Sequence, residues 1–174
     1  MQILLSSKQL SETIHKLADQ LAGYHKSVED VVFVGIQQGG VMVADEMIKH
    51  LEQFYPGKTL QYGQLDITFY RDDIRKEILA PDVMNLPFSI ENKTVILIDD
   101  VLFTGRTIKA ALDALLDYGR PAKVELCVLV DRKEHRQFPI QADYTGATLH
   151  TSKSDKVKLV KNEAGNKEVV LIVA

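Results

Sequence analysis

Residues Val95 to Thr107 read VILIDDVLFTGRT. This stretch opens with a run of apolar, mostly β-branched residues, which predicts a buried strand. Two adjacent carboxylates, Asp99 and Asp100, follow directly, although neighbouring like charges repel each other and are costly to desolvate. The packing of a core gives no reason for such a pair. We therefore interpret the end of this strand as part of a binding site.

The composition is that of an ordinary globular protein, and it narrows the function classes. The chain has 174 residues, of which 45% are hydrophobic and 26% charged. This length predicts a single domain over residues 1–174. The net charge of −3 gives no overall basic surface for nucleic acid. The one cysteine, Cys127, excludes an internal disulfide. Because neither a signal peptide nor an apolar run of ~18 residues is present, we expect a cytoplasmic protein without membrane contact.

The spacing of apolar residues predicts strands that alternate with helices. Helical periodicity indicates helices over residues 7–22, 41–51 and 105–118, the first beginning with a capping box of Ser6 and Gln9. Apolar runs predict strands over residues 31–36 and 60–70, from residue 95, and over residues 123–131. Residues 155–160 and 167–173 predict a C-terminal hairpin, because a turn-rich link joins them. Residues 71–93 predict a long connection or an irregular pair of strands.

This alternation predicts an α/β fold, because strands that are apolar throughout need a parallel sheet covered on both faces. In such sheets, ligands bind beyond the carboxyl ends of the strands. Three predicted strand ends carry reactive or flexible residues: GIQQGG from Gly35, IDDVLFTGRT from Ile98 and VDRKEHR from Val130. We expect these three segments to lie together.

The segment TGRT predicts a cradle for a phosphate monoester. Gly105 allows close approach of the backbone, Thr104 and Thr107 supply hydroxyls, and the N–H groups of the following helix point outward. The segment is not a nucleotide P-loop, because that motif needs a glycine where Asp100 stands. The neighbouring carboxylates suit the vicinal hydroxyls of a ribose. The alternative is a capped helix after a strand, with both aspartates simply solvated.

VILIDDVLFTGRT resembles the phosphoribosyl pyrophosphate (PRPP) signature of type I phosphoribosyltransferases. The segments DITFYRDD, VLVDRKEHRQFPIQADYTG and TSKSDKVKL extend the resemblance to the PyrR family, over nearly the whole chain. Members of that family are pyrimidine operon attenuators that also have uracil phosphoribosyltransferase activity. The resemblance implies a type I phosphoribosyltransferase fold, with a parallel sheet flanked by helices and a C-terminal β-hairpin.

The resemblance also implies roles for individual residues. Asp99 and Asp100 match the acidic pair that holds the ribose hydroxyls. The residues that match the loop for the 5-phosphate are Thr104, Gly105, Arg106 and Thr107. Those that lie where the pyrophosphate loop is expected are Gln37, Gln38, Gly39 and Gly40. Arg71 would lie on a mobile loop that closes over the site. Mg²⁺ would enter with PRPP and be held mainly through it rather than by direct protein ligands.

Other residues bear on the base and on the pyrophosphate. Asp131 and Arg132 end another predicted strand, where they could contact the pyrophosphate or its metal. The resemblance places Arg136 in a loop near the site. That loop reads DRKEHRQF, one residue longer than in relatives, which could shift Arg136. Phe103 stands where many purine phosphoribosyltransferases have an aspartate that serves the purine ring, so it favours a pyrimidine.

The sequence leaves three functions open. The first is a uracil phosphoribosyltransferase that binds PRPP, uracil and UMP, as a homodimer or a multiple of dimers. The second is an RNA-binding regulator that senses UMP or PRPP. We expect weak RNA binding, because Glu12, Asp19 and Gln141 remove positive charge from the face that the family uses. The third is a PRPP-binding remnant with little turnover, since QQGG carries no charge where relatives have an arginine. The glycines of QQGG would also suit a tight strand-to-helix turn.

Overall fold

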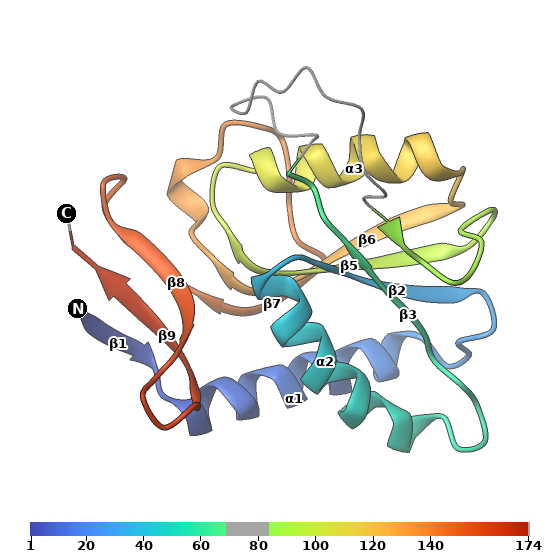
Figure 1. The fold of residues 1–174 in the computed structure, drawn as a ribbon, viewed down its shortest axis with the longest axis horizontal. Coiled ribbons are helices and arrows are strands. Elements are labelled where there is room, and N and C mark those ends of the chain that lie inside the picture. Colours follow the sequence, from blue (N-terminus) through green and yellow to red (C-terminus); the bar gives the residue numbers. More distant parts are fainter. Residues whose placement is uncertain (69–83, 174) are drawn as a thin grey trace.

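The computed structural model of the chain describes residues 1–68 and 84–173 (Figure 1). The helices are α1 (Ser7–Tyr24), α2 (Gly39–Leu51) and α3 (Arg106–Tyr118), with the 3-10 helices η1 (Glu52–Phe54) and η2 (Lys133–His135). The strands are β1 (Gln2–Leu5), β2 (Val31–Ile36), β3 (Gln61–Leu65), β4 (Met84–Asn85), β5 (Thr94–Leu102), β6 (Lys123–Asp131), β7 (Tyr144–Thr148), β8 (Lys156–Lys161) and β9 (Lys167–Ile172). Within these ranges, no helix has the length and apolar character to cross a membrane.

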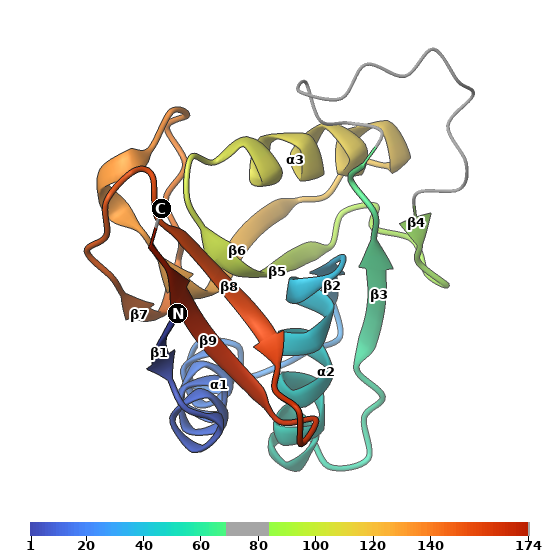
Figure 2. The same ribbon diagram turned by 60° about the vertical axis from the view of Figure 1, so that its left-hand side comes forward.

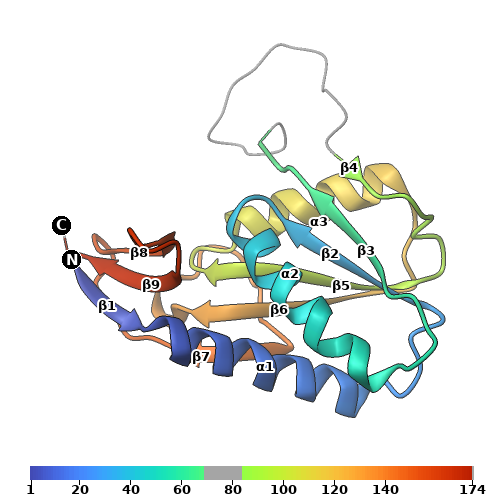
Figure 3. The ribbon, with the colours of Figure 1, turned by 60° about the horizontal axis from the view of Figure 1, so that its bottom comes forward.

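The centre of the molecule is a sheet with the strand order β4-β3-β2-β5-β6-β7. The pairs from β3 through β7 are parallel, and β4 runs antiparallel at the edge. Helices α1 and α2 cover one face and α3 covers the other (Figures 1 and 3). The predicted parallel sheet flanked by helices is therefore confirmed.

The strands of this sheet are buried on both faces. In β5, Ile96 and Ile98 pack in the cluster with α1 and α2, whereas Val95 and Leu97 pack in the cluster with α3. The whole of β2 is buried in the same way. This double burial explains the continuous apolar runs, because an amphipathic strand would leave polar residues against one layer of helices.

The register of the sheet sets where a site can form. Gly35 of β2 pairs with Ile98 of β5, and β2 ends one residue later, whereas β5 continues to Leu102. On the other side, Leu102 pairs with Asp131, and Asp131 pairs with Thr148 of β7. The carboxyl end of β5 therefore projects beyond β2 and lies beside the ends of β6 and β7.

A second, small sheet has the strand order β1-β9-β8 and is antiparallel (Figure 2). The predicted C-terminal hairpin is confirmed as β8 and β9. The sequence did not predict β1, which brings Gln2 opposite Leu171 and so joins the two ends of the chain. Its four residues are too short and too exposed to show a period.

Some predicted boundaries were wrong. The strand predicted over residues 60–70 ends at Leu65, because the Asp66 side chain accepts hydrogen bonds from the N–H and the hydroxyl of Thr68 and turns the chain. Residues 69 and 70 lie outside the described ranges. Strand β7 was not predicted, since its sequence, YTGAT, has no apolar alternation. The capping box of Ser6 and Gln9 is confirmed, although α1 continues past Gly23 to Tyr24.

A buried carboxylate ties α1 to the sheet at the edge opposite the carboxyl end of β5. Glu125 on β6 is 2% exposed, and its Oε1 lies 2.6 Å from Nε2 of His25 and accepts from the Tyr144 hydroxyl at 3.0 Å. Its Oε2 accepts from Lys123 at 3.0 Å. Burial raises the pKa of the Glu125 carboxyl, but these hydrogen bonds outweigh burial and hold that pKa below its ordinary value.

We predict that Glu125→Gln lowers the free energy of unfolding by about 1–3 kcal/mol at pH 7, because a buried charged acceptor is lost. Since the pKa of Glu125 is lowered by folding, its contribution is present above pH 4.5 and is lost as the pH falls below that value. Urea denaturation at pH 7 and at acid pH measures both effects.

The matched control is Glu163→Gln, at an exposed position of the link between β8 and β9, where a change within about 0.5 kcal/mol is expected. A difference between Glu125→Gln and the unmodified protein that stays constant from pH 7 down to strong acid would contradict the assigned pKa direction.

Candidate functional site

The acidic pair lies at the projecting end of β5. Asp99 is 5% exposed, and its Oδ1 accepts from the backbone N–H of Asp100 at 2.9 Å. Asp100 is half-buried, and its Oδ1 accepts from the N–H of Val101 at 2.8 Å. Burial and the neighbouring charge of Asp100 raise the pKa of Asp99 well above its ordinary value. Asp100 is therefore the member of the pair that presents charge at the surface.

The glycine pair at the start of α2 packs directly against this strand end. A Cβ atom on Gly39 would lie 2.0 Å from Oδ2 of Asp100, and one on Gly40 would lie 2.4 Å from the carbonyl oxygen of Ile98. Only glycine allows both approaches. The tight strand-to-helix turn considered from the sequence is thus present, and it also places these residues beside the acidic pair.

Gln37 and Gln38 are exposed at the same edge. The N–H of Gln37 donates to the carbonyl of Leu65 at 2.9 Å, and its side-chain amide donates to Gln64 at 3.4 Å. No side chain caps the N-terminus of α2, and its first turn holds no acidic residue. The helix therefore presents N–H groups and a partial positive charge beside the exposed amides.

The threonine loop forms a pocket of about 270 Å³ at the start of α3. Its lining consists of Asp99, Val101, Leu102, Phe103, Thr104, Gly105, Arg106, Thr107 and Ile108. Gly105 has φ +91°, a left-handed conformation that favours glycine, and no side chain caps α3. The N–H of Arg106 donates to the Thr104 hydroxyl at 3.3 Å. The exposed start of a helix with two threonine hydroxyls is suited to an anion such as a phosphate.

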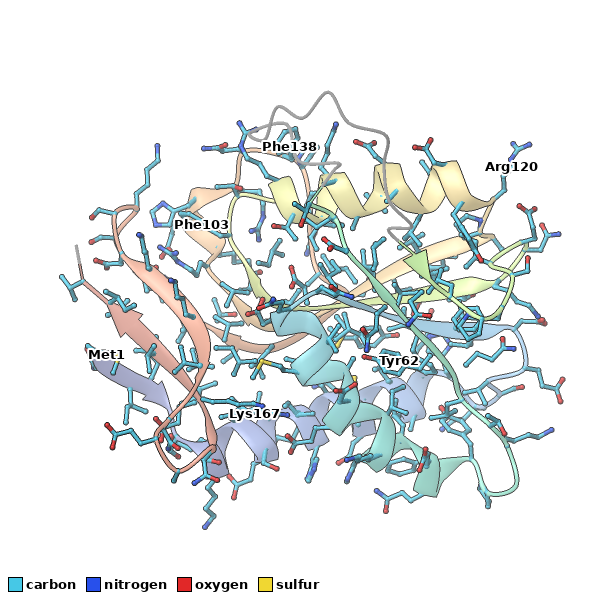
Figure 4. All side chains as sticks on the ribbon, in the orientation of Figure 1. Met1, Tyr62, Phe103, Arg120, Phe138 and Lys167 are labelled. Carbon is cyan, nitrogen blue, oxygen red and sulfur yellow. The ribbon has the colours of Figure 1, made fainter. Side chains whose placement is uncertain are left out.

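The segment after η2 braces this threonine loop. The N–H groups of Gln137 and Phe138 both donate to the carbonyl of Thr104, at 2.8 and 3.2 Å. The Arg106 side chain donates to Gln137 at 2.9 Å and lies over the Phe138 ring. Figure 4 shows Phe138 next to the start of α3, with Arg120 beyond the far end of that helix. The segment after η2 therefore fixes the backbone of the threonine loop and the side chain of Arg106.

The remaining predicted residues gather around Phe103. Arg132 stacks on its ring, with Cζ 3.9 Å from the ring centroid. Arg136 donates to the Phe103 carbonyl and forms an ion pair of 2.7 Å with Asp131. Arg136 is therefore held by contacts within the protein, and whether the longer loop shifts it relative to other members of the family stays a prediction. Arg71 lies outside the described residues.

A second pocket, of about 360 Å³, adjoins the first and was not predicted from the sequence. It shares Val101 and Phe103 with the first pocket. The rest of its lining is Arg132 together with Lys153, Ser154, Asp155, Lys156, Val157 and Lys158. The stretch TSKSDKVKL supplies this wall, but its residues do not form a motif that predicts a binding site. The two pockets together can hold a phosphorylated ligand with a second, bulkier part.

Comparisons with known proteins agree with this geometry. A family model described as the phosphoribosyl transferase domain matches residues 2–171. The chain is 46% identical to the bifunctional protein PyrR of Mannheimia succiniciproducens, over 90% of this chain and 89% of that protein. It is 44% identical to the bifunctional protein PyrR of Geobacter sp. strain M21, over 98% of this chain and 96% of that protein.

Among solved structures, the chain is similar to a hypoxanthine phosphoribosyltransferase from Staphylococcus aureus. The TM-score is 0.68 and the sequence identity 26%, and the match covers 87% of this chain and 79% of that one. The central sheet and its flanking helices therefore belong to a known architecture.

We predict that Gly40→Ala destabilises the protein by about 1–3 kcal/mol, because its new methyl group meets the fixed backbone of β5. Gly39→Ala should be less destabilising, since the atom it meets belongs to the Asp100 side chain, which can rotate away. Urea denaturation measures both variants.

The control is Gly23→Ala in α1, where a Cβ atom would meet nothing within 4 Å. That substitution should stabilise the protein by roughly 0.5–1 kcal/mol through helix propensity. A Gly40→Ala variant as stable as Gly23→Ala would show that α2 does not depend on this close approach.

Proposed function

Because the chain belongs to the PyrR family of phosphoribosyltransferases, we propose that it transfers the phosphoribosyl group of PRPP to uracil. The products are UMP and pyrophosphate. The observation that carries the proposal is the pair of adjoining pockets, which share Val101 and Phe103 at the carboxyl end of β5. One pocket contains a phosphate cradle beside the acidic pair, and the other has room for a base.

The proposed position of PRPP places each of its parts beside hydrogen-bonding groups of matching kind at the strand ends. Its 5-phosphate would accept hydrogen bonds from the N–H groups and hydroxyls of the loop Thr104–Thr107. The ribose hydroxyls would donate to Asp99 and Asp100, which lie one short loop away. The pyrophosphate group would face the N-terminus of α2 and the amides of Gln37 and Gln38.

Asp100 and this pyrophosphate position also fit a bound Mg²⁺. Within residues 1–68 and 84–173, no three His, Cys, Asp or Glu side chains form a metal site. Mg²⁺ usually keeps several waters and binds through one or two carboxylates plus the phosphates of a substrate. Asp100 is such a half-buried carboxylate beside the loop that would receive the pyrophosphate. The ion would neutralise charge on the leaving group.

The chemistry proposed for the chain is positioning and charge stabilisation. As the bond from C1 of the ribose to the pyrophosphate oxygen breaks, its electron pair leaves with pyrophosphate and positive charge builds on the ribose. The Asp100 carboxylate stabilises that charge, while Asp99 holds a ribose hydroxyl, and the base nitrogen then bonds to C1 and releases its proton to solvent. Phe103 has no group that accepts a proton, which favours a pyrimidine over a purine.

We predict that the purified protein converts uracil and PRPP to UMP, whereas hypoxanthine and guanine react more slowly or not at all. Chromatographic separation of the nucleotide products, with each base at equal concentration, measures this preference. A purine that reacts at least as fast as uracil would overturn the choice of base.

A second variant tests the acidic pair. Asp100→Asn should lower turnover at least tenfold while changing the free energy of unfolding by less than about 1 kcal/mol. Normal uracil turnover in this variant would remove Asp100 from the site. PRPP binding without turnover in the unmodified protein would instead identify a binding remnant.

A second function, weak RNA binding, is proposed because the chain resembles pyrimidine operon attenuators and its relatives bear the name bifunctional protein PyrR. Helix α1, which the resemblance assigns to RNA binding, carries carboxylates between its basic residues. Asp19 of α1 pairs with His50 of α2 at 3.0 Å, and His15 lies 3.6 Å from Glu46. Glu12 is exposed on α1, whereas Gln141 lies beside α3 on the other side of the sheet, so the two do not share the single face expected from the sequence. The carboxylates of Glu12 and Asp19 oppose the binding of phosphates.

We predict binding to a pyrimidine-leader hairpin no tighter than micromolar at physiological salt, with little enhancement by UMP. Each phosphate contact to a single strand would add roughly 0.7 to the slope of log affinity against log salt, so few contacts give a shallow slope. Filter binding with the organism's own leader RNA measures this. Nanomolar, UMP-enhanced binding would make regulation the leading function.

A further inference from the structure

The loop that follows β6 holds Phe103 on three sides. The Arg132 guanidinium covers one face of the ring, with Cζ 3.9 Å from its centroid. The His135 ring meets the phenyl ring edge-on, at 5.5 Å between centroids and 72° between planes. Arg136 donates to the backbone carbonyl of Phe103. A single short loop therefore fixes both the ring and the backbone of this residue.

The same loop holds the opposite wall of the second pocket. Nε of Arg132 donates to the Thr151 hydroxyl at 2.8 Å, and one of its terminal nitrogens donates to the carbonyl of Ser152 at 2.9 Å. Nε2 of His135 lies 2.7 Å from the carbonyl oxygen of Thr151. Ser152 in turn forms a tight turn with Asp155, through hydrogen bonds of 2.9 and 3.1 Å.

Arg132 and His135 each contact both Phe103 and the start of this wall, and of the two Arg132 is the one that lines the second pocket. Arg132 is 3% exposed, which is unusual for an arginine that meets a soluble anion. Its planar, rigid fork allows stacking and two hydrogen bonds at once, whereas a lysine ammonium cannot stack in this way.

We propose that Arg132 is a positioning residue for the base, which sets the separation between Phe103 and the segment from Thr151 to Lys158. This inference rests on the proposed function and assigns Arg132 to the base side of the site rather than to the pyrophosphate. The ligand part that depends on it is a planar pyrimidine ring. The loop of the phosphate cradle is braced by Gln137 and Phe138, so we expect it to depend less on Arg132 than the second pocket does.

The test compares two probes that share a phosphorylated ribose and differ in the base, namely UMP and ribose 5-phosphate. Calorimetric titration of Arg132→Met should show at least tenfold weaker binding of UMP, with binding of ribose 5-phosphate changed less than twofold. Arg132→Lys keeps the positive charge but loses the stacking on Phe103 and the paired guanidinium hydrogen bonds. It should therefore also weaken UMP binding without weakening ribose 5-phosphate binding. Equal weakening of both probes would overturn the inference.

Two further variants separate positioning from general damage. Lys133→Met changes an exposed neighbour on η2 and should leave both affinities unchanged. Phe103→Leu should weaken the binding of UMP. The double variant Phe103→Leu with Arg132→Met should bind UMP almost as tightly as Phe103→Leu alone, because the two residues act as one unit. Additive losses in the double variant would contradict a role for Arg132 through Phe103.

Turnover separates this inference from the proposed function. If the unmodified protein fails to convert uracil, the proposed function fails, while the comparison of UMP with ribose 5-phosphate still decides the role of Arg132. If uracil is converted, Arg132→Met should raise the KM for uracil at least tenfold and leave the Kd for PRPP within twofold. The reverse pattern would assign Arg132 to the pyrophosphate.

Discussion

The contact between the first turn of α2 and the end of β5 is the constraint on which the site depends. Gly39 and Gly40 let a helix backbone approach a carboxylate and a strand carbonyl at distances that no Cβ atom allows. This approach is possible because β5 continues past the end of β2, so its last residues face the start of α2. The acidic pair and the glutamine loop become neighbours through backbone packing, without flexible side chains between them.

The other half of the site is organised differently, by side chains on a short loop. There, Arg132 and Arg136 are directed into the protein, toward Phe103, Thr151 and Asp131. Buried guanidinium groups need several acceptors, and carbonyls and a carboxylate supply them here. At the start of α2, glycines that lack a Cβ atom allow close packing. In the loop after β6, hydrogen bonds from guanidinium groups fix the structure instead.

The sequence predicted the features that depend on local patterns. Periodicity and capping predicted α1, the buried strands and the hairpin, because those signals lie within one element. It did not predict β1, which pairs with a strand at the far end of the chain, or β7, which lacks alternation. It also could not show that Arg132 stacks on Phe103 and donates to Thr151, since these contacts depend on how three distant segments meet.

The loop Gln37–Gly40 carries no charge and lies beside the carboxylate of Asp100. A pyrophosphate held at the start of α2 would lie close to that carboxylate, because Gly39 is in contact with it. The helix N-terminus and two neutral amides supply only partial charges, which compensate several negative charges weakly. PRPP bound at this edge, as proposed, would therefore depend on a cation that enters with the substrate, more than in a relative whose loop carries an arginine. The missing arginine and the half-buried Asp100 carboxylate would create the same requirement from opposite sides of the loop.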